Sequence, residues 1–592
     1  MGESESYTVA DAFLESLALA GIDYIFAVLG SDHPSIIEAY VRRQSSPDQQ
    51  WPKLLLFLHE FVAMSAADGY ARLTGKPQCV LVHVDVGTNA LGQGLHNASS
   101  GKAPVLIFAG QAPYTLYGEL PGSRSEHVQW YQDVPNQHMM VAPFSRYSNE
   151  IKAGEHVQMM VNRALLMSTT GSPGPVYLTA TREVLASRTE RPRKVKMPSC
   201  AIGGLPDHAI AMIGDAIIQA KRPLVVTGYL GRNHEAVNAL IQLADVVDSL
   251  GVFDFEQREM SFPSTHEAWL SRAAGAGQAI KTADVILVID ADVPWIPTKV
   301  KPSPEATIFH VDLDPRKEMM NLFDIYADAT FHGDSNTILR QLHTYTLKHQ
   351  PSSVTDGVSD RRQTYESGLK ALSQRAAPAS DGFLTKDFLF RTIRETVPED
   401  SVFVHDAITN QIALTEQLQL SRPGSNFSKG GSGLGWACGA AIGISLALKW
   451  YDLGSPPSSN RRESEGPSKF VVNIIGDGAF MFSSPSAVFW AAYRHKTPFL
   501  TIVLNNGGWK ATRSCVNDVH PGGLAAGMSD EQLAIDLKME GPDYCGIAKA
   551  GSNGHLRTWK INRWEDLKAA LQEAVVAVQN GTGAIIDAVV KD

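Results

Sequence analysis

Short apolar segments rich in β-branched residues recur along the whole chain, and each is followed by a stretch long enough for a helix. They lie at 79–84, 104–110, 175–180, 223–229, 284–290, 307–314, 401–406, 469–478, 498–506 and 583–590. Continuous apolar runs of this length are typical of parallel strands buried on both faces, with the intervening helices covering the sheet. Because the runs fall into three sets, the pattern predicts an α/β fold with three doubly wound parallel sheets.

The three sets also predict the domain organisation. The expected domains are residues 1–188, 205–347 and 380–592. A basic and then Pro/Gly-rich stretch at 187–206 connects the first two sets. The polar stretch 348–363 has no hydrophobic period and is predicted to be a surface linker. A second polar stretch, 452–468, is predicted to be a disordered surface insertion.

Composition excludes several classes of function. The 592 residues are 44% hydrophobic, which is ample for several cores. A formal net charge of -10 without any Lys/Arg-rich cluster argues against nucleic-acid binding. No apolar run is long enough to cross a membrane. The five scattered cysteines and the acidic N-terminus predict reduced thiols, no targeting peptide and a cytoplasmic location.

Polar residues follow two successive apolar strands in the segment 469–514. One strand ends in the turn 476–478, which reads Gly-Asp-Gly, and the next ends in Asn505 and Asn506. Adjacent parallel strands end at one edge of a sheet, where ligands bind in open α/β folds. The Asp477 carboxylate and an Asn carbonyl suit Mg²⁺, and the glycines let phosphate approach the backbone. The alternative is an ordinary turn after each strand, but the occurrence of both motifs at strand ends favours a magnesium–phosphate site.

At these residues the chain resembles the thiamine diphosphate (ThDP) enzyme superfamily, whose diphosphate–Mg²⁺ signature has this pattern. The resemblance implies that Asp477, Asn506 and the carbonyl of Gly508 hold Mg²⁺. It also implies cofactor contacts at Gly476, Gly478 and Ala479.

A glutamate about four hundred residues upstream supports the same resemblance. Glu60 follows an apolar strand and begins a helix, where its charge alone would favour the helix dipole. The run 60–77, EFVAMSAADGYARLTGKP, is similar to the acetolactate synthase and benzoylformate decarboxylase branch of the superfamily. In that branch a glutamate shares a proton with N1′ of the aminopyrimidine and so promotes the nucleophilic ylid. The resemblance implies this role for Glu60.

Two further segments match the family's cofactor contacts. In the glycine-rich segment 427–448, Leu434 corresponds to the residue that wedges between the two cofactor rings, and the Ser432 carbonyl to the acceptor of the 4′-amino group. The alternative is a glycine-rich helix start with Leu434 in the core. The strand end near 405–411 matches the family's other diphosphate loop and implies contacts from Thr409 and Asn410.

Histidines near the ends of two N-terminal strands are candidate catalytic groups. His83 falls where the benzoylformate enzyme has a catalytic histidine, and Ser31 where it has a substrate-binding serine. His33 is a second candidate for proton transfer near neutral pH. The alternatives are a buried structural role for His83 and a turn role for His33, which precedes a proline.

Loops that should face the cofactor supply the expected substrate pocket. Trp295, Trp509 and Lys510 are its candidate residues, although a loop tryptophan can also cap a core. The segment 515–541 is predicted to form a lid, and its Met/Leu content suggests an apolar substrate. The central loop 285–299 lacks the Arg-rich segment of flavin-binding acetolactate synthases, so FAD is not expected.

The resemblance implies a Mg²⁺/ThDP-dependent lyase or carboligase of the acetolactate synthase kind, acting on 2-oxo acids. Decarboxylation would leave an enamine, which is protonated to an aldehyde or attacks an aldehyde or 2-oxo acid acceptor. The alternatives are a simple decarboxylase of the benzoylformate type, a 2-hydroxyacyl-CoA lyase and an inactive ThDP-binding regulatory subunit. Retention of Glu60, Asp477 and Asn506 argues against the last. Because the family binds the cofactor between two subunits, a homodimer is the expected minimum and a homotetramer the expected assembly.

Overall fold

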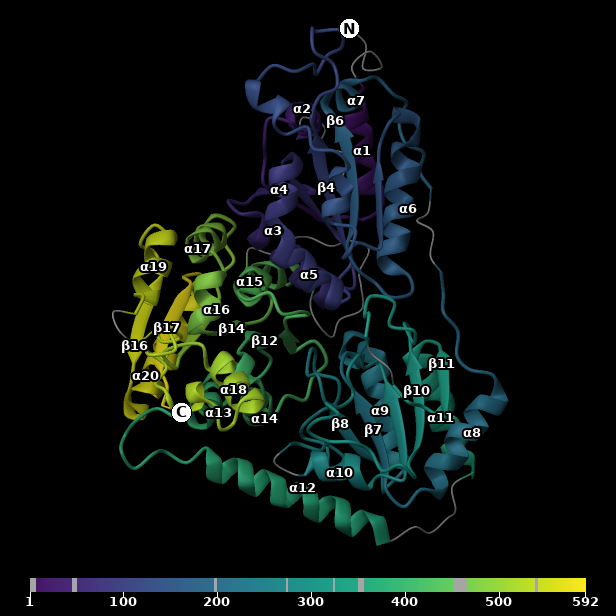
Figure 1. Ribbon diagram of the computed structural model, residues 1–592, viewed down its shortest axis with the longest axis vertical. Coiled ribbons are helices and arrows are strands. Elements are labelled where there is room, and N and C mark those ends of the chain that lie inside the picture. Colours follow the sequence, from purple (N-terminus) through teal and green to yellow (C-terminus); the bar gives the residue numbers. More distant parts are fainter. Residues whose placement is uncertain are drawn as a thin grey trace.

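The computed structural model places three parallel sheets in three lobes (Figure 1). It describes residues 7–44, 51–195, 200–272, 275–322, 325–349, 356–451, 466–537 and 541–591. The fold class predicted from the sequence is confirmed. Most of the predicted insertion at 452–468 lies outside the described residues, as do 196–199 of the first connecting stretch.

The N-terminal sheet has six parallel strands in the order β2-β1-β3-β4-β6-β5. Its helices cover both faces of the sheet, so its central strands are fully buried. Its elements are α1 (Val9–Leu19), β1 (Tyr24–Ala27), α2 (Pro34–Gln44), β2 (Lys53–Leu56), α3 (Glu60–Thr74), β3 (Gln78–Val82), α4 (Val84–Ala90), α5 (Gly92–Ser100), β4 (Val105–Gln111), β5 (Tyr147–Glu150), α6 (Val157–Thr169), β6 (Val176–Thr181) and α7 (Arg182–Ala186).

The central sheet has five parallel strands in the order β11-β10-β9-β7-β8. Its elements are α8 (Asp207–Gln219), β7 (Pro223–Thr227), α9 (His234–Val246), β8 (Gly251–Asp254), α10 (Ala276–Thr282), β9 (Val285–Ile289), β10 (Thr307–Asp312), β11 (Ala329–His332) and α11 (Ser335–His349).

The C-terminal sheet has six parallel strands in the order β13-β12-β14-β15-β17-β16. Its elements are α13 (Lys386–Thr396), β12 (Val402–Asp406), α14 (Gln411–Leu418), β13 (Asn426–Ser428), α15 (Trp436–Ala447), β14 (Val471–Gly476), α16 (Asp477–Phe482), α17 (Pro485–Arg494), β15 (Leu500–Asn505), α18 (Lys510–Val519), α19 (Tyr544–Gly551), β16 (Arg557–Ile561), α20 (Trp564–Gln579) and β17 (Ala584–Val589).

The surface linker predicted at 348–363 is helical over its second half, and its residues 350–355 lie outside the described residues. Helix α12 (Asp356–Arg375) begins inside it and runs below the central and C-terminal lobes (Figure 1). Polar side chains anchor this helix: Arg361 binds Glu267 of the central domain at 2.6 Å, and Arg375 binds Glu416 of the C-terminal domain at 2.9 Å. A helix held by ion pairs at its surface needs no broad apolar stripe, which explains why the hydrophobic period was absent.

The N- and C-terminal domains share one continuous core across helices α3 and α15. Glycines let the two helices approach closely, since the separation of packed helices depends on the side chains at the contact. A Cβ on Gly69 would lie 2.5 Å from the carbonyl oxygen of Ala440, and one on Gly443 would lie 1.8 Å from that of Ala66. The two outer domains are therefore fixed rigidly against each other within one chain.

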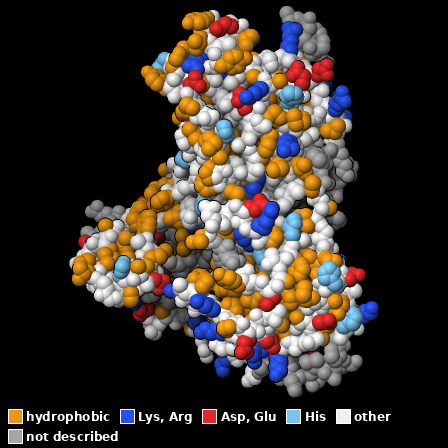
Figure 2. Space-filling model, turned by 45° about the vertical axis from the view of Figure 1, so that its right-hand side comes forward, with side chains coloured by type: hydrophobic (Ala, Val, Ile, Leu, Met, Phe, Trp, Pro, Cys, Tyr) orange, Lys and Arg blue, Asp and Glu red, His pale blue; other side chains and the backbone are white. Residues whose placement is uncertain are grey.

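Figure 2 shows one face of the molecule, on which charges of both signs are interspersed with apolar side chains. No continuous basic patch covers this face. Among the described residues, no helix is long and apolar enough to cross a membrane.

Candidate functional site

The Gly-Asp-Gly turn lies where β14 ends and α16 begins, at the carboxyl edge of the C-terminal sheet. The Asp477 carboxylate accepts hydrogen bonds from the amides of Gly478 at 2.7 Å, Gly507 at 2.8 Å and Gly508 at 3.1 Å. Burial raises the pKa of Asp477, although these three amides act in the opposite direction. The two halves of the motif thus lie together because β14 and β15 are neighbours in the sheet.

The loop after β15 reaches Asp477 only with glycines. Gly507 has a φ of 78° and Gly508 a φ of 147°, both in the region that side chains disfavour. A Cβ on Gly508 would also lie 2.3 Å from the carbonyl oxygen of Ile535. Asn506, beside them, is buried.

This edge offers one carboxylate, one amide side chain and backbone carbonyls to a metal. In the described part of the chain no three His, Cys, Asp or Glu side chains gather in a metal-binding cluster. A metal at Asp477 would therefore rest on few protein ligands and keep positions for water and phosphate oxygens. That donor set fits Mg²⁺, which is usually held by one or two carboxylates and by substrate phosphates.

The predicted cofactor contacts around this turn have different exposures. Gly476 is partly exposed, and Gly478 and Ala479 are buried. At the end of β12, Thr409 is exposed and Asn410 is buried.

Two candidate substrate residues follow the glycine loop. The Trp509 ring lies over Gly478, where a Cβ would be 3.1 Å from it, and at 6.2 Å from the ring of Phe482. Lys510 binds Asp530 at 2.9 Å, so its ammonium group faces the predicted lid segment. The third candidate, Trp295, packs against the core of the central domain.

The glycine-rich segment before α15 contacts the N-terminal domain of the same chain. The Ser432 amide donates to His96 Nε2 at 3.0 Å, and Asn97 exchanges two hydrogen bonds with the backbone of Gly433. Ser432 itself is exposed, and Leu434 is partly buried against the shared core of the outer domains.

Glu60 begins helix α3 behind the N-cap residue His59, whose ring accepts the Phe61 amide at 3.1 Å. Its side chain lies against α4, since a Cβ on Gly87 would be 3.3 Å from Glu60 Oε1. Glu60 and Gly87 both belong to the N-terminal domain, whereas Asp477 and the three amides that donate to it belong to the C-terminal domain.

His83 caps the start of α4 and is held from both sides of its ring. Nδ1 lies 2.6 Å from Asp32 Oδ1, and Nε2 lies 3.0 Å from Gln132 Nε2. The hydrogen bond to Asp32 raises the pKa of His83, although partial burial opposes it. Burial opposes ionisation of Asp32 as well, but the hydrogen bond from His83 and the nearby charges hold the pKa of Asp32 below its ordinary value.

His33 and Ser31 lie on the same loop as Asp32. The His33 ring is fully buried; its Nδ1 accepts the Gly30 amide at 3.0 Å, and its centroid is 6.5 Å from that of His83. Burial lowers the pKa of His33, so its neutral form is favoured. Ser31 is partly exposed.

Two glycines enclose the Asp32–His83 pair. A Cβ on Gly30 would lie 2.2 Å from the His83 ring, and one on Gly110 would lie 1.9 Å from Asp32 Oδ2. Val84, whose amide donates to Asp32 at 3.1 Å, has a φ of 31°. Strained backbone of this kind clusters at functional sites, where the surrounding structure maintains it.

Asp32 and Gln132 were not identified from the sequence. The loop 31–33 had been singled out for its serine and its histidine, and the aspartate between them was the missed signal. No sequence pattern marks Gln132, which comes just after a short 3-10 helix (His127–Trp130) and reaches His83 only in the folded domain.

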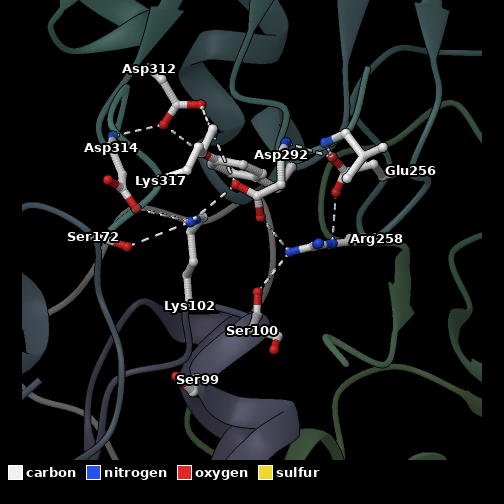
Figure 3. A network of polar contacts seen from close by, with 12 residues as sticks. Ser99, Ser100, Lys102, Ser172, Glu256, Arg258, Asp292, Asp312, Asp314 and Lys317 are labelled. Atoms are coloured by element: carbon white, nitrogen blue, oxygen red, sulfur yellow. Dashed lines mark hydrogen bonds and ion pairs between the residues drawn. The ribbon is translucent and has the colours of Figure 1, made fainter. Parts of the chain in front are cut away.

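A second ionic cluster fills the carboxyl edge of the central sheet (Figure 3). Lys317 binds Asp312 at 2.5 Å and Asp292 at 2.9 Å. Lys102 extends from the end of α5 in the N-terminal domain to Asp292, at 3.2 Å. Burial opposes the ionisation of Asp292, but the surrounding cations outweigh it and hold its pKa well below the ordinary value.

Arg258 connects this cluster to a further carboxylate of the central domain and to the backbone of the N-terminal domain. It binds Asp292 at 3.1 Å and Glu256 at 2.8 Å, and donates to the carbonyl oxygen of Ser100 at 2.7 Å (Figure 3). The side chains at the edge where a Rossmann-type domain binds nucleotides are thus engaged with one another.

Comparison with known proteins agrees with this architecture. The chain matches the family models described as the Thiamine pyrophosphate enzyme N-terminal TPP binding domain at residues 7–140, the central domain at 210–342 and the C-terminal TPP binding domain at 407–588. It is 24% identical over 586 residues to the benzoylformate decarboxylase of Pseudomonas aeruginosa, covering 96% of this chain and 97% of that one. It is 23% identical over 514 residues to the acetolactate synthase of Mycobacterium bovis, covering 85% of this chain and 76% of that one.

A solved structure shows the same fold. The thiamine diphosphate-dependent 4-hydroxybenzoylformate decarboxylase of Rhodococcus jostii RHA1 superposes with a TM-score of 0.76 at 21% identity, covering 99% of each chain. The fold, the two outer domains and the family models together place the chain among enzymes that use thiamine diphosphate. The protein belongs to the thiamine diphosphate-dependent enzyme superfamily.

Proposed function

We propose that the protein is a Mg²⁺- and ThDP-dependent lyase or carboligase that acts on 2-oxo acids. The observation that supports this most strongly is the pair of motifs in the two outer domains: Glu60 at the start of α3, and the Asp477 carboxylate turned toward the loop of Asn506 and Gly508. Relatives of both kinds, a decarboxylase and an acetolactate synthase, match over most of the chain.

Each residue has a distinct part in this proposal. When bound, ThDP would supply a nucleophilic carbon and an electron sink for decarboxylation of a 2-oxo acid. Glu60 would hold a proton for the aminopyrimidine, and Asp477, Asn506 and the Gly508 carbonyl would hold Mg²⁺ for the diphosphate. His83 exchanges a proton with the substrate, while Trp509 and Lys510 line the pocket.

The proposed working unit contains at least two subunits. Glu60 and Asp477 lie in different domains, and each has its contacts within its own domain. A cofactor bound by the N-terminal domain of one subunit and the C-terminal domain of another would use both. We therefore propose a homodimer as the minimum and a homotetramer as the assembly, to be measured by sedimentation equilibrium.

Substitution of Glu60 tests the proposed chemistry. Glu60→Gln should lower turnover of 2-oxo acids by at least about 100-fold, since a positioned proton-transfer group contributes about 10²–10⁴ in rate. It should also remove the circular-dichroism signal that the cofactor's imino tautomer gives on adding ThDP and Mg²⁺. Glu38→Gln, at a glutamate whose side chain is 68% exposed on α2, is the matched control. Unchanged turnover in Glu60→Gln would contradict the proposal.

Metal removal tests the other half of the site. Dialysis against a chelator should abolish turnover, and ThDP together with Mg²⁺ should restore it. Reactivation by ThDP alone, without any divalent metal, would contradict the roles given to Asp477 and Asn506.

Product analysis separates the candidate reactions. We propose carboligation, with acyloin or acetohydroxy acid products, as the main reaction, and simple decarboxylation to an aldehyde as the alternative. A panel of 2-oxo acids with and without aldehyde acceptors, analysed by mass, decides between them. We also propose that the central domain binds no flavin, because its ligand edge is engaged by Lys102, Lys317 and Arg258; flavin absorbance in the purified protein would contradict this.

A further inference from the structure

The N-terminal domain contains an acid–base arrangement that the cofactor chemistry does not by itself require. Asp32 is 3% exposed and lies 2.6 Å from His83 Nδ1, while the His83 side chain is 20% exposed. The ring therefore has one nitrogen against a buried carboxylate. Its other nitrogen lies toward the partly exposed side chain of Gln132.

The Asp32 carboxylate determines which nitrogen of His83 carries the fixed proton. An ionised carboxylate can only accept, so Nδ1 donates, and a second amide, that of Val84, holds the other carboxylate oxygen at 3.1 Å. Neutral His83 is thereby kept in the Nδ1–H tautomer, with Nε2 as its unprotonated, basic atom.

The side chain of Gln132 can form a hydrogen bond with His83 Nε2 whether or not that nitrogen carries a proton. A carboxamide presents an N–H to an unprotonated Nε2, and after rotation it presents its oxygen to a protonated one. A carboxylate at this place would favour one state, whereas the neutral amide accommodates both.

The enclosure prevents the pair from rearranging. Gly30 and Gly110 leave no space beside the His83 ring and Asp32 Oδ2, and the backbone of Val84 has a strained φ. Close packing of this kind fixes the orientation of both side chains, as required of groups that support a catalytic residue.

We propose that Asp32 is a positioning residue that keeps a proton on Nδ1 of His83. The other nitrogen, Nε2, which contacts Gln132, is then the atom that exchanges a proton with the substrate. This rests on the proposed function. The Nε2 proton passes to the 2-oxo oxygen of the substrate as that oxygen gains charge. Nδ1 keeps its proton and Asp32 stays ionised, and Nε2 then regains a proton from water.

Other titratable groups also lie near His83. They are the buried and neutral His33, whose ring centroid is 6.5 Å from that of His83, and the carboxylates of Asp85 and Glu126, whose charges raise the pKa of His83. Asp32 differs from the two carboxylates because it adds a direct hydrogen bond to its charge, and that bond is the main cause of the raised pKa of His83.

Labelling of the full-length protein, loaded with ThDP and Mg²⁺, tests the proposal. Diethyl pyrocarbonate modifies unprotonated imidazole, so the labelling of the His83 peptide against pH, followed by mass spectrometry, gives its titration midpoint. We expect a wild-type midpoint above the ordinary histidine value of about 6.5, and a fall of about 1–2 pH units in Asp32→Asn. Asp85→Asn, which removes a nearby carboxylate that acts through charge, should shift the midpoint much less.

Kinetics provide the second measurement. In Asp32→Asn, kcat for the best 2-oxo acid of the panel should fall by about 10-fold or more, with its pH profile displaced in the same direction as the labelling midpoint. KM should change little, because Asp32 is buried and acts through His83.

The outcomes are decisive separately. A wild-type midpoint at or below about 6.5 would overturn the role of Asp32 even if the variant fails to fold. An equal shift in Asp85→Asn, or an unchanged midpoint and pH profile in Asp32→Asn, would also overturn it. Absence of any 2-oxo acid turnover in the wild type would refute the proposed function instead, while the labelling midpoint would still decide the Asp32–His83 pairing.

Discussion

Two groups of ionisable side chains in this protein are built from similar parts and differ in their access to solvent. The Asp32–His83 pair lies in the N-terminal domain, with a histidine that is 20% exposed and bonded to a neutral amide. In the central cluster, Lys317 is 4% exposed and is bonded to two carboxylates, Asp292 and Asp312. Each buried charge of the central cluster is compensated by others, whereas the pair retains one atom that can gain or lose a proton.

This difference in solvent access suits the central cluster to stabilising the fold and the Asp32–His83 pair to chemistry. A compensated buried cluster holds its protonation state over a wide pH range, and breaking it is costly because a charge is left alone. A pair with one accessible nitrogen titrates near neutral pH and can take part in a reaction. Buried aspartates therefore join two domains at one place and position a proton at another.

The largest expected effect is at Lys317. Lys317→Met should lower the free energy of unfolding by about 3–5 kcal/mol, because the buried carboxylate of Asp312 loses the lysine that binds it, whereas Asp292 keeps Lys102 and Arg258. Denaturant unfolding measures this, and the His83 labelling midpoint should not change. Lys299→Met, in an ion pair whose two side chains are each 59% exposed, is the control and should cost about 0–1 kcal/mol. Equal losses of stability in the two variants would show that burial of the Lys317 cluster does not make it more stabilising than an exposed ion pair.

Crowding the Asp32–His83 pair should have a smaller effect on stability. In Gly110→Ala the new methyl group would meet Asp32 Oδ2, and overpacking of this kind costs about 1–3 kcal/mol. The His83 midpoint should move toward that of Asp32→Asn as the carboxylate is displaced. Gly92→Ala, where a Cβ meets nothing within 4 Å, should leave both measurements close to wild type. A His83 labelling midpoint equal to that of the wild type in Gly110→Ala would show that close packing at Gly110 is not needed to hold Asp32 against His83.

The pH dependence of stability should show the smallest effect. His83 has a raised pKa in the folded state, so its contribution is fully present below about 6.5 and is lost as pH rises through the folded value. Asp32 has a lowered pKa, so its contribution is present above its ordinary value and is lost as pH falls through the folded one. The difference in unfolding free energy between wild type and Asp32→Asn should thus be largest near pH 5–6 and smaller by about 1 kcal/mol at alkaline pH. A difference independent of pH would mean that Asp32 does not stabilise the charged form of His83.

Much of the fold was predictable because buried strands are written locally in the sequence. Each of the ten apolar runs overlaps a strand of the structure. The strands without such a run are β1, which has only four residues, and edge or near-edge strands such as β5, β11 and β16, whose exposed positions interrupt the apolar pattern. An edge strand has one neighbour and faces solvent along its other side, so its sequence resembles that of a loop.

The candidate site divides in the same way. Glu60 and the loops around Asp477 and Asn506 were identified because each lies in a local motif, and their roles remain predictions to be tested as described above. Asp32 was not predicted as a site residue, because its role depends on His83, 51 positions further along the chain. The contact exists because β1 and β3 are neighbouring parallel strands, which brings the loops after their carboxyl ends together.

Three parallel α/β domains and two motifs typical of ThDP binding could be predicted from the sequence, since each of these depends on residues close together in the chain. Which charges compensate one another depends instead on how the domains pack. The cluster around Lys317 receives Lys102 from another domain, and His83 receives Asp32 and Gln132 from two separate loops. The physical reason is that burial and hydrogen bonding set the protonation state of these groups, and both depend on neighbours that only the packed sheets bring together.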